Sequence, residues 1–241
     1  MASFNIMNPQ KTIIFLHGWA NSSEVFMPLS YYLKNDFFIY APDLPGFGKC
    51  PIEKPMTLKD YADFVYKFIK DNQLEKPIII GHSFGGAIAA KLAILHPEII
   101  SKLILVGASV IREFIFKIKF TEKSAKIIKK IIPKKFHPFI LKFLGLDNSD
   151  YARIENPYLK ETFKIVIKEN LAPELPLIKT PTLIVWGKND IETPLKEGEK
   201  IAKLIPNAKL EIIEDAGHHV FLDKPLEFIN EIKKFIISPS A

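Results

Sequence analysis

The sequence contains little cysteine and no long uninterrupted run of apolar residues. Cys50 is the only cysteine among 241 residues, which excludes an intrachain disulfide and any thiolate-rich metal site. The first eleven residues contain no apolar stretch long enough for a secretory signal. No later stretch approaches the roughly 18 consecutive apolar residues that a membrane-spanning helix needs. These absences predict a cytoplasmic protein with no membrane span.

Acidic residues are scarce in one segment, from Ile111 to Gly145. Only Glu113 and Glu122 occur there, against ten basic residues, so the net charge of the segment is 10 − 2 = +8. The net charge of the whole chain is +6. The remainder of the chain therefore sums to 6 − 8 = −2. The sequence pI of about 9.1 thus comes from one segment that carries no nucleic-acid-binding motif, and we expect no nucleic-acid partner. The basic residues are Arg112, Lys117, Lys119, Lys123, Lys126, Lys129, Lys130, Lys134, Lys135 and Lys142.

Short, mostly apolar segments alternate with longer amphipathic segments along most of the chain. The short segments predict strands at Thr12–Leu16, Phe37–Ala41, Pro77–Gly81, Lys102–Gly107, Thr182–Trp186 and Ala208–Ile213. The longer segments predict helices at about Ser22–Asn35, Thr57–Asn72, Phe84–Leu95, Pro194–Leu204 and Pro225–Ile237. Strands that are apolar throughout are covered on both faces. The alternation therefore predicts an α/β fold whose mostly parallel sheet has helices on both faces.

The alternation stops between about Val110 and Thr180, where only helical patterns continue. They are at Thr121–Ile132, Pro138–Leu144 and Tyr158–Glu169. In the first, lysines occupy one side and isoleucines the other, at about 100° per residue. We therefore predict a core domain, residues 1–110 and 181–241, with a helical cap, residues 111–180. Candidate pocket residues in the cap are Phe114, Phe116, Phe136, Phe139 and Phe143.

The run Gly81-His82-Ser83-Phe84-Gly85 carries the first candidate for chemistry. It follows a predicted strand and precedes a predicted helix, which is the context of a nucleophile elbow of the form G-x-S-x-G. The glycines keep side chains out of a crowded turn. The N-terminal N–H groups of the new helix point toward developing negative charge. Ser83 is therefore the predicted nucleophile.

A serine hydroxyl needs a base, and the base needs an orienting carboxylate. In the order Ser, acid, His, the base lies late in the chain after the last strand. His218 and His219 both occupy that place. Asp190 follows the strand Thr182–Trp186, and Glu192 is its alternative two residues later. The spacing of these residues alone leaves both pairs open.

Backbone N–H groups are the predicted donors for an oxyanion. One is that of Phe84, the residue after the nucleophile. The other comes from the loop after the first strand, His17-Gly18-Trp19, so the N–H of Trp19 is the second candidate. His17 and His82 are expected to have structural hydrogen-bonding roles. Neither a metal nor a cofactor is implied by this set of residues.

Together these motifs resemble the α/β-hydrolase superfamily, in order from about Thr12 to Phe235. Besides the elbow and the His-Gly-Trp loop they include Asp43-Leu44-Pro45-Gly46-Phe47-Gly48, Trp186-Gly187-Lys188-Asn189-Asp190 with Pro194, and Gly217-His218 with Asp223 and Pro225. In that family the base directly follows the glycine, which implies His218, and the Trp-Gly-x-x-Asp register implies Asp190. Only about eleven residues precede the first predicted strand here, whereas family members usually begin with a hairpin. The resemblance thus implies six to eight strands, with the N-terminal hairpin shortened.

The resemblance implies a serine hydrolase. A serine nucleophile excludes haloalkane dehalogenases and epoxide hydrolases, because those enzymes of this fold use an aspartate nucleophile. The expected function is hydrolysis of short- to medium-chain acyl esters through an acyl-enzyme, a carboxylesterase activity on a small-molecule ester. The His-Gly-Trp loop, the Asp-Leu-Pro-Gly-Phe-Gly segment and the basic cap together resemble esterases that demethylate pimeloyl groups on acyl carrier protein. Carrier proteins are acidic, so an acidic carrier protein is a candidate partner. The alternatives are a carbon–carbon hydrolase of ring-fission products, an acyltransferase and a ligand receptor on the same scaffold.

Overall fold

Six strands form one parallel sheet in the computed structural model, which describes residues 11–111 and 154–238. The strand order is β2-β1-β3-β4-β5-β6, and every neighbouring pair is parallel. The strands are β1 (Lys11–Leu16), β2 (Phe37–Tyr40), β3 (Ile78–His82), β4 (Lys102–Val106), β5 (Thr182–Gly187) and β6 (Ala208–Ile213). The central strands β3, β4 and β5 are buried along their whole length. The predicted α/β class and the parallel sheet are confirmed.

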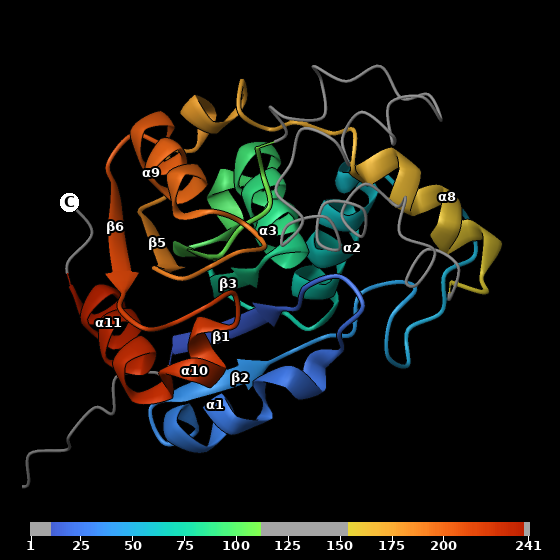
Figure 1. Ribbon diagram of the computed structural model, residues 1–241. Coiled ribbons are helices and arrows are strands. Elements are labelled where there is room, and N and C mark those ends of the chain that lie inside the picture. The colour runs from blue at the N-terminus through green and yellow to red at the C-terminus, as the bar shows by residue number, and fades with distance from the viewer. Residues whose placement is uncertain (1–10, 112–153, 239–241) are drawn as a thin grey trace, which may run out of the picture.

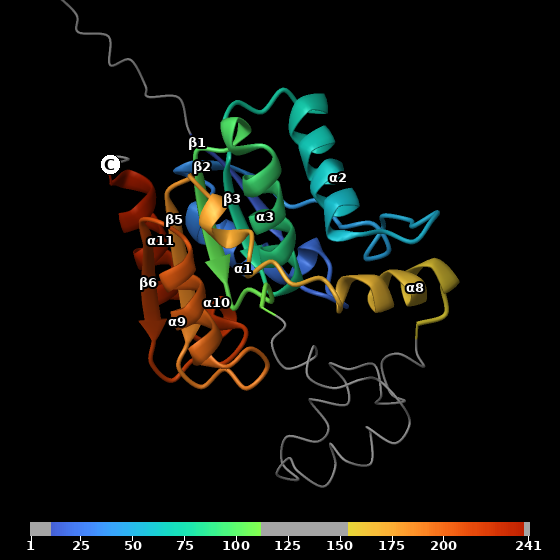
Figure 2. The same cartoon turned by 90° about the horizontal axis from the view of Figure 1, so that it is seen from above.

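Helices cover both faces of the sheet (Figures 1 and 2). On one face lie α2 (Leu58–Asp71), α3 (Phe84–Leu95) and α9 (Leu195–Leu204), which pack in one apolar cluster. On the other lie α1 (Met27–Leu33), α10 (Val220–Asp223) and α11 (Pro225–Ile237) in a second cluster. Alternate residues of each buried strand point to opposite faces, so one strand contributes to both clusters. Short 3-10 turns occur at Ser23–Phe26, Pro97–Ile99 and Leu175–Leu177.

The segment predicted as one helix from Ser22 to Asn35 is divided in the structure. A 3-10 turn, Ser23–Phe26, leads into α1 at Met27. Pro28 stands in the first turn of α1, where its missing N–H does no harm, whereas in the interior of a longer helix it would remove a hydrogen bond. The proline thus explains why the second helix begins there.

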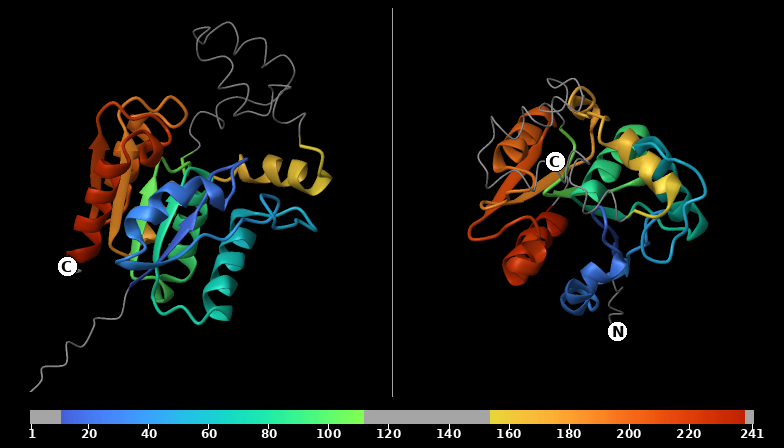
Figure 3. Two further views of the ribbon diagram at one scale, coloured as in Figure 1. Left: turned by 90° about the horizontal axis from the view of Figure 1, so that it is seen from below. Right: turned by 45° about the vertical axis from the view of Figure 1, so that its right-hand side comes forward.

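The described part of the predicted cap contains one helix, α8 (Pro157–Val166), where the sequence predicted Tyr158–Glu169. It lies beside the N-terminal end of α2 (Figures 1 and 3). Two backbone N–H groups near that end donate to this part of the chain, Met56 to Thr162 Oγ1 at 2.9 Å and Leu58 to Glu169 Oε1 at 2.8 Å. The predicted helices Thr121–Ile132 and Pro138–Leu144 and all five pocket phenylalanines lie outside the described residues.

Candidate active site

The predicted site residues lie in loops at the carboxyl ends of four parallel strands. Ser83 follows β3, Trp19 follows β1, Asp190 follows β5 and His218 follows β6. In a parallel sheet these ends share one edge, so residues far apart in the sequence are brought together there. The loop after the neighbouring strand β4 adds Ser109, whose N–H donates to the carbonyl of Ser83 at 3.1 Å.

Ser83 forms a sharp turn between β3 and α3. Its φ of 52° and ψ of −113° lie in a region that residues with a side chain rarely adopt. The turn is held by its backbone, since the Ser83 N–H donates to the carbonyl of Val106 at 2.9 Å. A methyl group at Gly85 would lie 2.1 Å from the carbonyl oxygen of Leu16, and one at Gly81 would lie 2.4 Å from that of Gly85. The two glycines of the motif are thus required by close backbone packing.

The loop after β1 lies against this turn. A methyl group on Gly18 would lie 3.3 Å from Cβ of Ser83. His17 anchors the loop, because its Nε2 accepts from the N–H of Leu44 at 3.0 Å and its Nδ1 donates to the carbonyl of Gly18 at 2.9 Å. Burial lowers the pKa of His17, which keeps the ring neutral, as the accepting Nε2 requires. His17 therefore has the structural role that the sequence predicted.

His218 and Asp190 form a buried hydrogen-bonded pair. His218 Nδ1 lies 2.8 Å from Asp190 Oδ2, and the side chains are only 6% and 0% exposed. The other carboxylate oxygen of Asp190 accepts the N–H groups of Glu192 at 2.8 Å and Thr193 at 2.9 Å. These two backbone donors fix the orientation of the carboxylate. Asp190 is thus oriented by its own loop and presents one oxygen to the imidazole.

The two alternatives that the residue spacing left open occupy different positions. Glu192 is half-exposed, and its Oε2 lies 3.7 Å from His218 Nε2, on the opposite side of the ring from Asp190. His219 turns toward His82 and Phe221, with ring centroids 4.8 and 5.9 Å apart, and burial lowers its pKa. Among these four residues the short contact joins Asp190 and His218.

His82 connects the turn at Ser83 with the loop of His218. Its Nε2 lies 3.0 Å from the carbonyl oxygen of His218, and its ring centroid lies 4.7 Å from that of His218. Burial, and then the neighbouring histidines, lower the pKa of His82 well below 6.5, so the ring is neutral and Nε2–H donates to the carbonyl. The residue before Ser83 thus fixes the backbone of His218.

An aromatic cluster borders the same edge of the sheet. The ring of Trp19 contacts those of Phe47, Phe84 and Phe163, with centroids 4.9, 5.2 and 5.1 Å apart. Phe163 belongs to α8, so the cluster joins that helix to the loop after β1 and to the start of α3. Phe163 was not predicted from the sequence, nor was Thr193, which contacts both Asp190 and His218.

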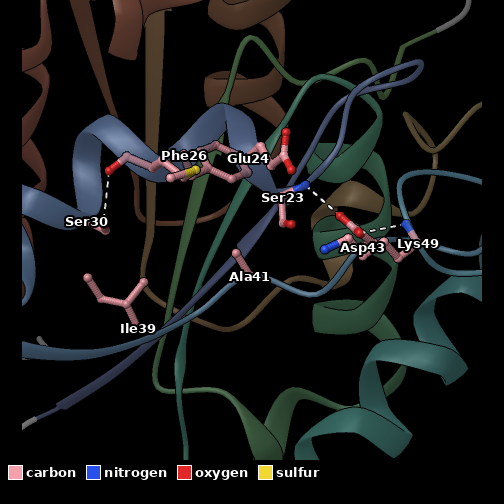
Figure 4. Close-up of a pocket in the computed structure, with 9 residues that line it drawn as sticks. Ser23, Glu24, Phe26, Ser30, Ile39, Ala41, Asp43 and Lys49 are labelled. Carbon is pink, nitrogen blue, oxygen red and sulfur yellow. Dashed lines mark hydrogen bonds between the residues drawn. The ribbon is translucent and has the colours of Figure 1, made fainter.

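A cavity of about 300 Å³ lies elsewhere, between α1 and the β2 edge of the sheet (Figure 4). Asp43 lies at its rim, and its carboxylate accepts hydrogen bonds from the N–H groups of Ser23 at 2.7 Å and Lys49 at 2.8 Å. The carboxylate therefore holds the surrounding loops together. None of its lining residues is a predicted site residue. They are Ser23, Glu24, Phe26, Met27, Ser30, Ile39, Ala41, Asp43 and Lys49.

Residues 11–111 and 154–238 hold no group of three or more His, Cys, Asp or Glu side chains that could bind a metal ion. Over the same two ranges, no helix has both the length and the apolar character to cross a bilayer. Cys50 is half-buried, and burial raises the pKa of its thiol. A protonated thiol is a weak nucleophile, so the candidate chemistry stays with Ser83.

Comparison with known proteins gives one consistent result. The sequence profile of the alpha/beta hydrolase fold family matches residues 11–124 and 134–225. The chain is 28% identical over 254 residues to a pimeloyl-[acyl-carrier protein] methyl ester esterase of Wigglesworthia glossinidia brevipalpis, covering 93% of each. It is 29% identical over 235 residues to a protein of the same name from Legionella pneumophila, covering 93% of this chain and 94% of that one.

A solved structure of an alpha/beta hydrolase from a metagenome of Mar Chica lagoon sediments superposes with a TM-score of 0.70. It is 25% identical in sequence, and the match covers 94% of this chain and 90% of that one. The match includes most of both chains, so the two proteins share the overall fold.

Proposed function

The chain belongs to the α/β-hydrolase fold family, and from that premise we propose that it is a serine-dependent carboxylic ester hydrolase. The observation that carries the proposal is the buried contact of 2.8 Å between His218 Nδ1 and Asp190 Oδ2. It occurs at the sheet edge where Ser83 occupies a strained turn. A nucleophile on a turn, with a base oriented by a buried carboxylate, is the arrangement that acyl transfer requires.

In the proposed mechanism Ser83 Oγ attacks the ester carbonyl while His218 Nε2 takes its proton. Asp190 holds the hydrogen of the imidazole on Nδ1 and stabilises the imidazolium that forms. The backbone N–H groups of Trp19 and Phe84 receive the negative charge of the tetrahedral intermediate. His218 then gives its proton to the departing alkoxide, which leaves as the alcohol. A water molecule, activated by the same imidazole, hydrolyses the acyl-enzyme and restores Ser83.

The surroundings of Ser83 favour an apolar acyl group. Trp19, Phe47, Phe84 and Phe163 form contacts around the proposed oxyanion donors. Aromatic rings at that position exclude water and stabilise an alkyl chain by burial. We therefore propose esters of short- to medium-chain acids as the substrate class. The mechanism uses side chains and backbone groups only, with no metal or cofactor.

A narrower candidate is a methyl ester linked to an acyl carrier protein. Two relatives at 28% and 29% identity carry that activity in their names. The sequence offers an independent reason, because residues 111–145 carry a net charge of +8 and carrier proteins are acidic. A carbon–carbon hydrolase would use the same three residues, and a ligand receptor would bind without turnover. The proposal for carrier-linked esters rests on ester hydrolysis and refines it.

Ester hydrolysis is tested by removing the proposed nucleophile and base separately. Ser83→Ala and His218→Ala are each expected to lower kcat by roughly 10⁴ to 10⁶ on a series of chromogenic acyl esters, because the two residues act as a unit. His219→Ala is the matched control and should have a much smaller effect. Labelling by a fluorophosphonate should disappear in Ser83→Ala. Retention of a tenth of the activity in Ser83→Ala would exclude Ser83 as the nucleophile.

A further inference from the structure

Glu192 places a second carboxylate beside the imidazole of His218. Its Oε2 lies 3.7 Å from His218 Nε2, whereas Asp190 contacts Nδ1 on the other side of the ring. The backbone of Glu192 is fixed, because its N–H donates to Asp190 Oδ1 at 2.8 Å. The mechanism proposed above uses the carboxylate of Asp190 and leaves that of Glu192 without a role.

The two carboxylates differ in their surroundings. The Asp190 side chain is buried, while that of Glu192 is 47% exposed. Within residues 11–111 and 154–238, no lysine or arginine forms an ion pair with Glu192, and its charged contact is the ring of His218. A solvent-exposed glutamate is ionised at neutral pH. A negative charge with no fixed cation therefore stands beside Nε2, the nitrogen proposed to exchange protons with the substrate.

The leaving alcohol must pass close to this charge. In the proposed mechanism the departing oxygen takes its proton from His218 Nε2, so it lies about 3 Å from that nitrogen at the moment of transfer. Since Glu192 Oε2 lies 3.7 Å from the same nitrogen, the two oxygens are no more than about 7 Å apart. A charge two carbons further along the alcohol is then well inside the screening length of about 30 Å at 0.01 M salt.

We propose that Glu192 determines specificity on the leaving-group side of the site. Its carboxylate favours esters of cationic alcohols over esters of neutral alcohols with the same shape, and it disfavours esters of anionic alcohols. The inference rests on the proposed function, because Nε2 meets the leaving group only where His218 is the base. The bonds made and broken are those of ester hydrolysis, and Glu192 neither gives nor takes a proton.

A pair of esters that differ in charge and not in shape tests the proposal. Acetylcholine and 3,3-dimethylbutyl acetate have the same acyl group, and their alcohols differ in a central quaternary nitrogen or carbon. The ratio of kcat/KM for the cationic ester to that for the neutral ester should fall about 3- to 10-fold in Glu192→Gln at 0.01 M salt, the scale of one charge pair at this distance in a partly solvated site. The carboxylate also stabilises the imidazolium for both esters, and this common effect cancels in the ratio.

Asp215→Asn is the matched control, because it removes one negative charge from the loop that carries His218. The Asp215 side chain is 82% exposed and lies 3.8 Å from Lys224 Nζ, and its φ of 53° is one that asparagine also adopts. This variant should leave the ratio as in the wild type. Raising the salt to 0.15 M should lower the wild-type ratio toward that of Glu192→Gln, because screening weakens the attraction.

Inhibition by the free alcohols gives a second readout on the chromogenic ester used for Ser83→Ala. The inhibition constant of choline should rise several-fold in Glu192→Gln, while that of 3,3-dimethylbutanol should not follow it. An unchanged ester ratio in Glu192→Gln, or the same fall in Asp215→Asn, would overturn the role of Glu192 and leave ester hydrolysis by Ser83 intact. Absence of hydrolysis of every ester would instead overturn the proposed function, and this inference with it.

Discussion

Ser83 keeps a backbone conformation with positive φ that costs on the order of 1–3 kcal/mol for a residue with a side chain. Hydrogen bonds of the surrounding backbone stabilise this conformation. The N–H of Ser83 bonds to Val106, and its carbonyl accepts from the N–H groups of Gly86 and Ser109 at 3.0 and 3.1 Å. Relaxation of the turn would break these bonds in a buried region. The strained turn is therefore maintained by hydrogen bonds to the end of β4, to the loop after it and to the first turn of α3.

Single residues also show where sequence reasoning succeeds and where it ends. Asp190 and His218 could be predicted to lie together, because the ends of parallel strands share one edge and the order of the motifs assigns each to a strand. Thr193 and Phe163 could not, because their relevance depends on side chains from other loops. Thr193 contacts His218, 25 residues later, and Phe163 contacts Trp19. No spacing rule in the sequence links those pairs.

His82 gives a prediction for stability as a function of pH. Burial lowers its pKa in the folded state well below the ordinary 6.5, so below that pH the unfolded chain binds a proton that the folded chain does not. Folding stability must then fall as the pH falls below about 6.5, by up to about 1.4 kcal/mol per pH unit for this residue. His82→Gln, which keeps an N–H donor for the carbonyl of His218, should show a shallower fall.

Urea unfolding of the two proteins between about pH 8 and pH 5.5 measures the difference. At the upper pH neither state holds the proton, so the difference there reports only the change in packing. His17 and His219 also have lowered pKa values, but they are present in both proteins and contribute equally. Parallel stability curves for His82→Gln and the wild type would show that His82 is protonated in the folded state.

The C-terminal end of helix α11 depends on a residue of the central strand β4. Lys102, at the start of β4, is buried, and its Nζ donates to the carbonyls of Phe235, Ile236 and Ser238 at 2.7, 3.1 and 2.6 Å. The last carbonyls of a helix have no partner inside the helix and carry partial negative charge. The buried ammonium of Lys102 donates to three such carbonyls, so the ammonium and the carbonyls both have hydrogen-bond partners. A lysine in an apolar strand pattern thus acts as the C-terminal cap of α11, which no local pattern could predict.

Lys102→Met should therefore lower the free energy of unfolding by about 1–3 kcal/mol, because it leaves carbonyl groups buried without a donor. Lys11→Met is the matched control, since Lys11 is exposed and donates to a single carbonyl of α11, that of Ile236, at 3.1 Å. It should change stability by no more than about 0.5 kcal/mol. Equal losses for the two variants, measured by urea unfolding, would show that the carbonyl cap contributes nothing specific.

At the scale of the whole molecule, the sheet order and the two layers of helices follow from patterns that are repeated along the chain. Apolar strands separated by amphipathic helices allow few arrangements other than a parallel sheet with both faces covered. The order of the strands does not follow from alternation alone. The chain runs outward from β1 to the edge strand β2, returns past β1 to β3, and then continues to β6. Periodicity does not predict that order.

The uneven distribution of charge is the property of the whole chain most relevant to the choice of substrate. Residues 111–145 carry +8 and the rest carries −2, so the positive charge is concentrated in one part of the chain. The field of such a charge accelerates encounter with an acidic macromolecule and has little effect on a small neutral ester. Screening shortens the reach of the field from about 30 Å at 0.01 M salt to about 8 Å at 0.15 M.

These considerations predict a salt dependence that differs between two substrates with the same reacting group. For a methyl ester carried on an acidic carrier protein, kcat/KM should fall at least several-fold between those two salt concentrations. For a small neutral methyl ester it should change little, because neither encounter nor chemistry involves a charged partner. Steady-state kinetics on both substrates with one enzyme preparation makes the comparison.

Two quadruple variants with the same net charge then identify the source of the attraction. The first changes Lys123, Lys126, Lys129 and Lys130 to glutamine and should lose both the rate advantage and the salt dependence on the carrier-linked ester. The second changes Lys59, Lys67, Lys209 and Lys234 to glutamine; these lysines are exposed and paired with acidic neighbours. It should retain most of the rate advantage and most of the salt dependence. If both variants lose the same fraction, the attraction follows from total charge and the segment has no special role. If the carrier-linked ester shows no salt dependence in the wild type, the lysines are a solvated surface and the physiological ester is a small molecule.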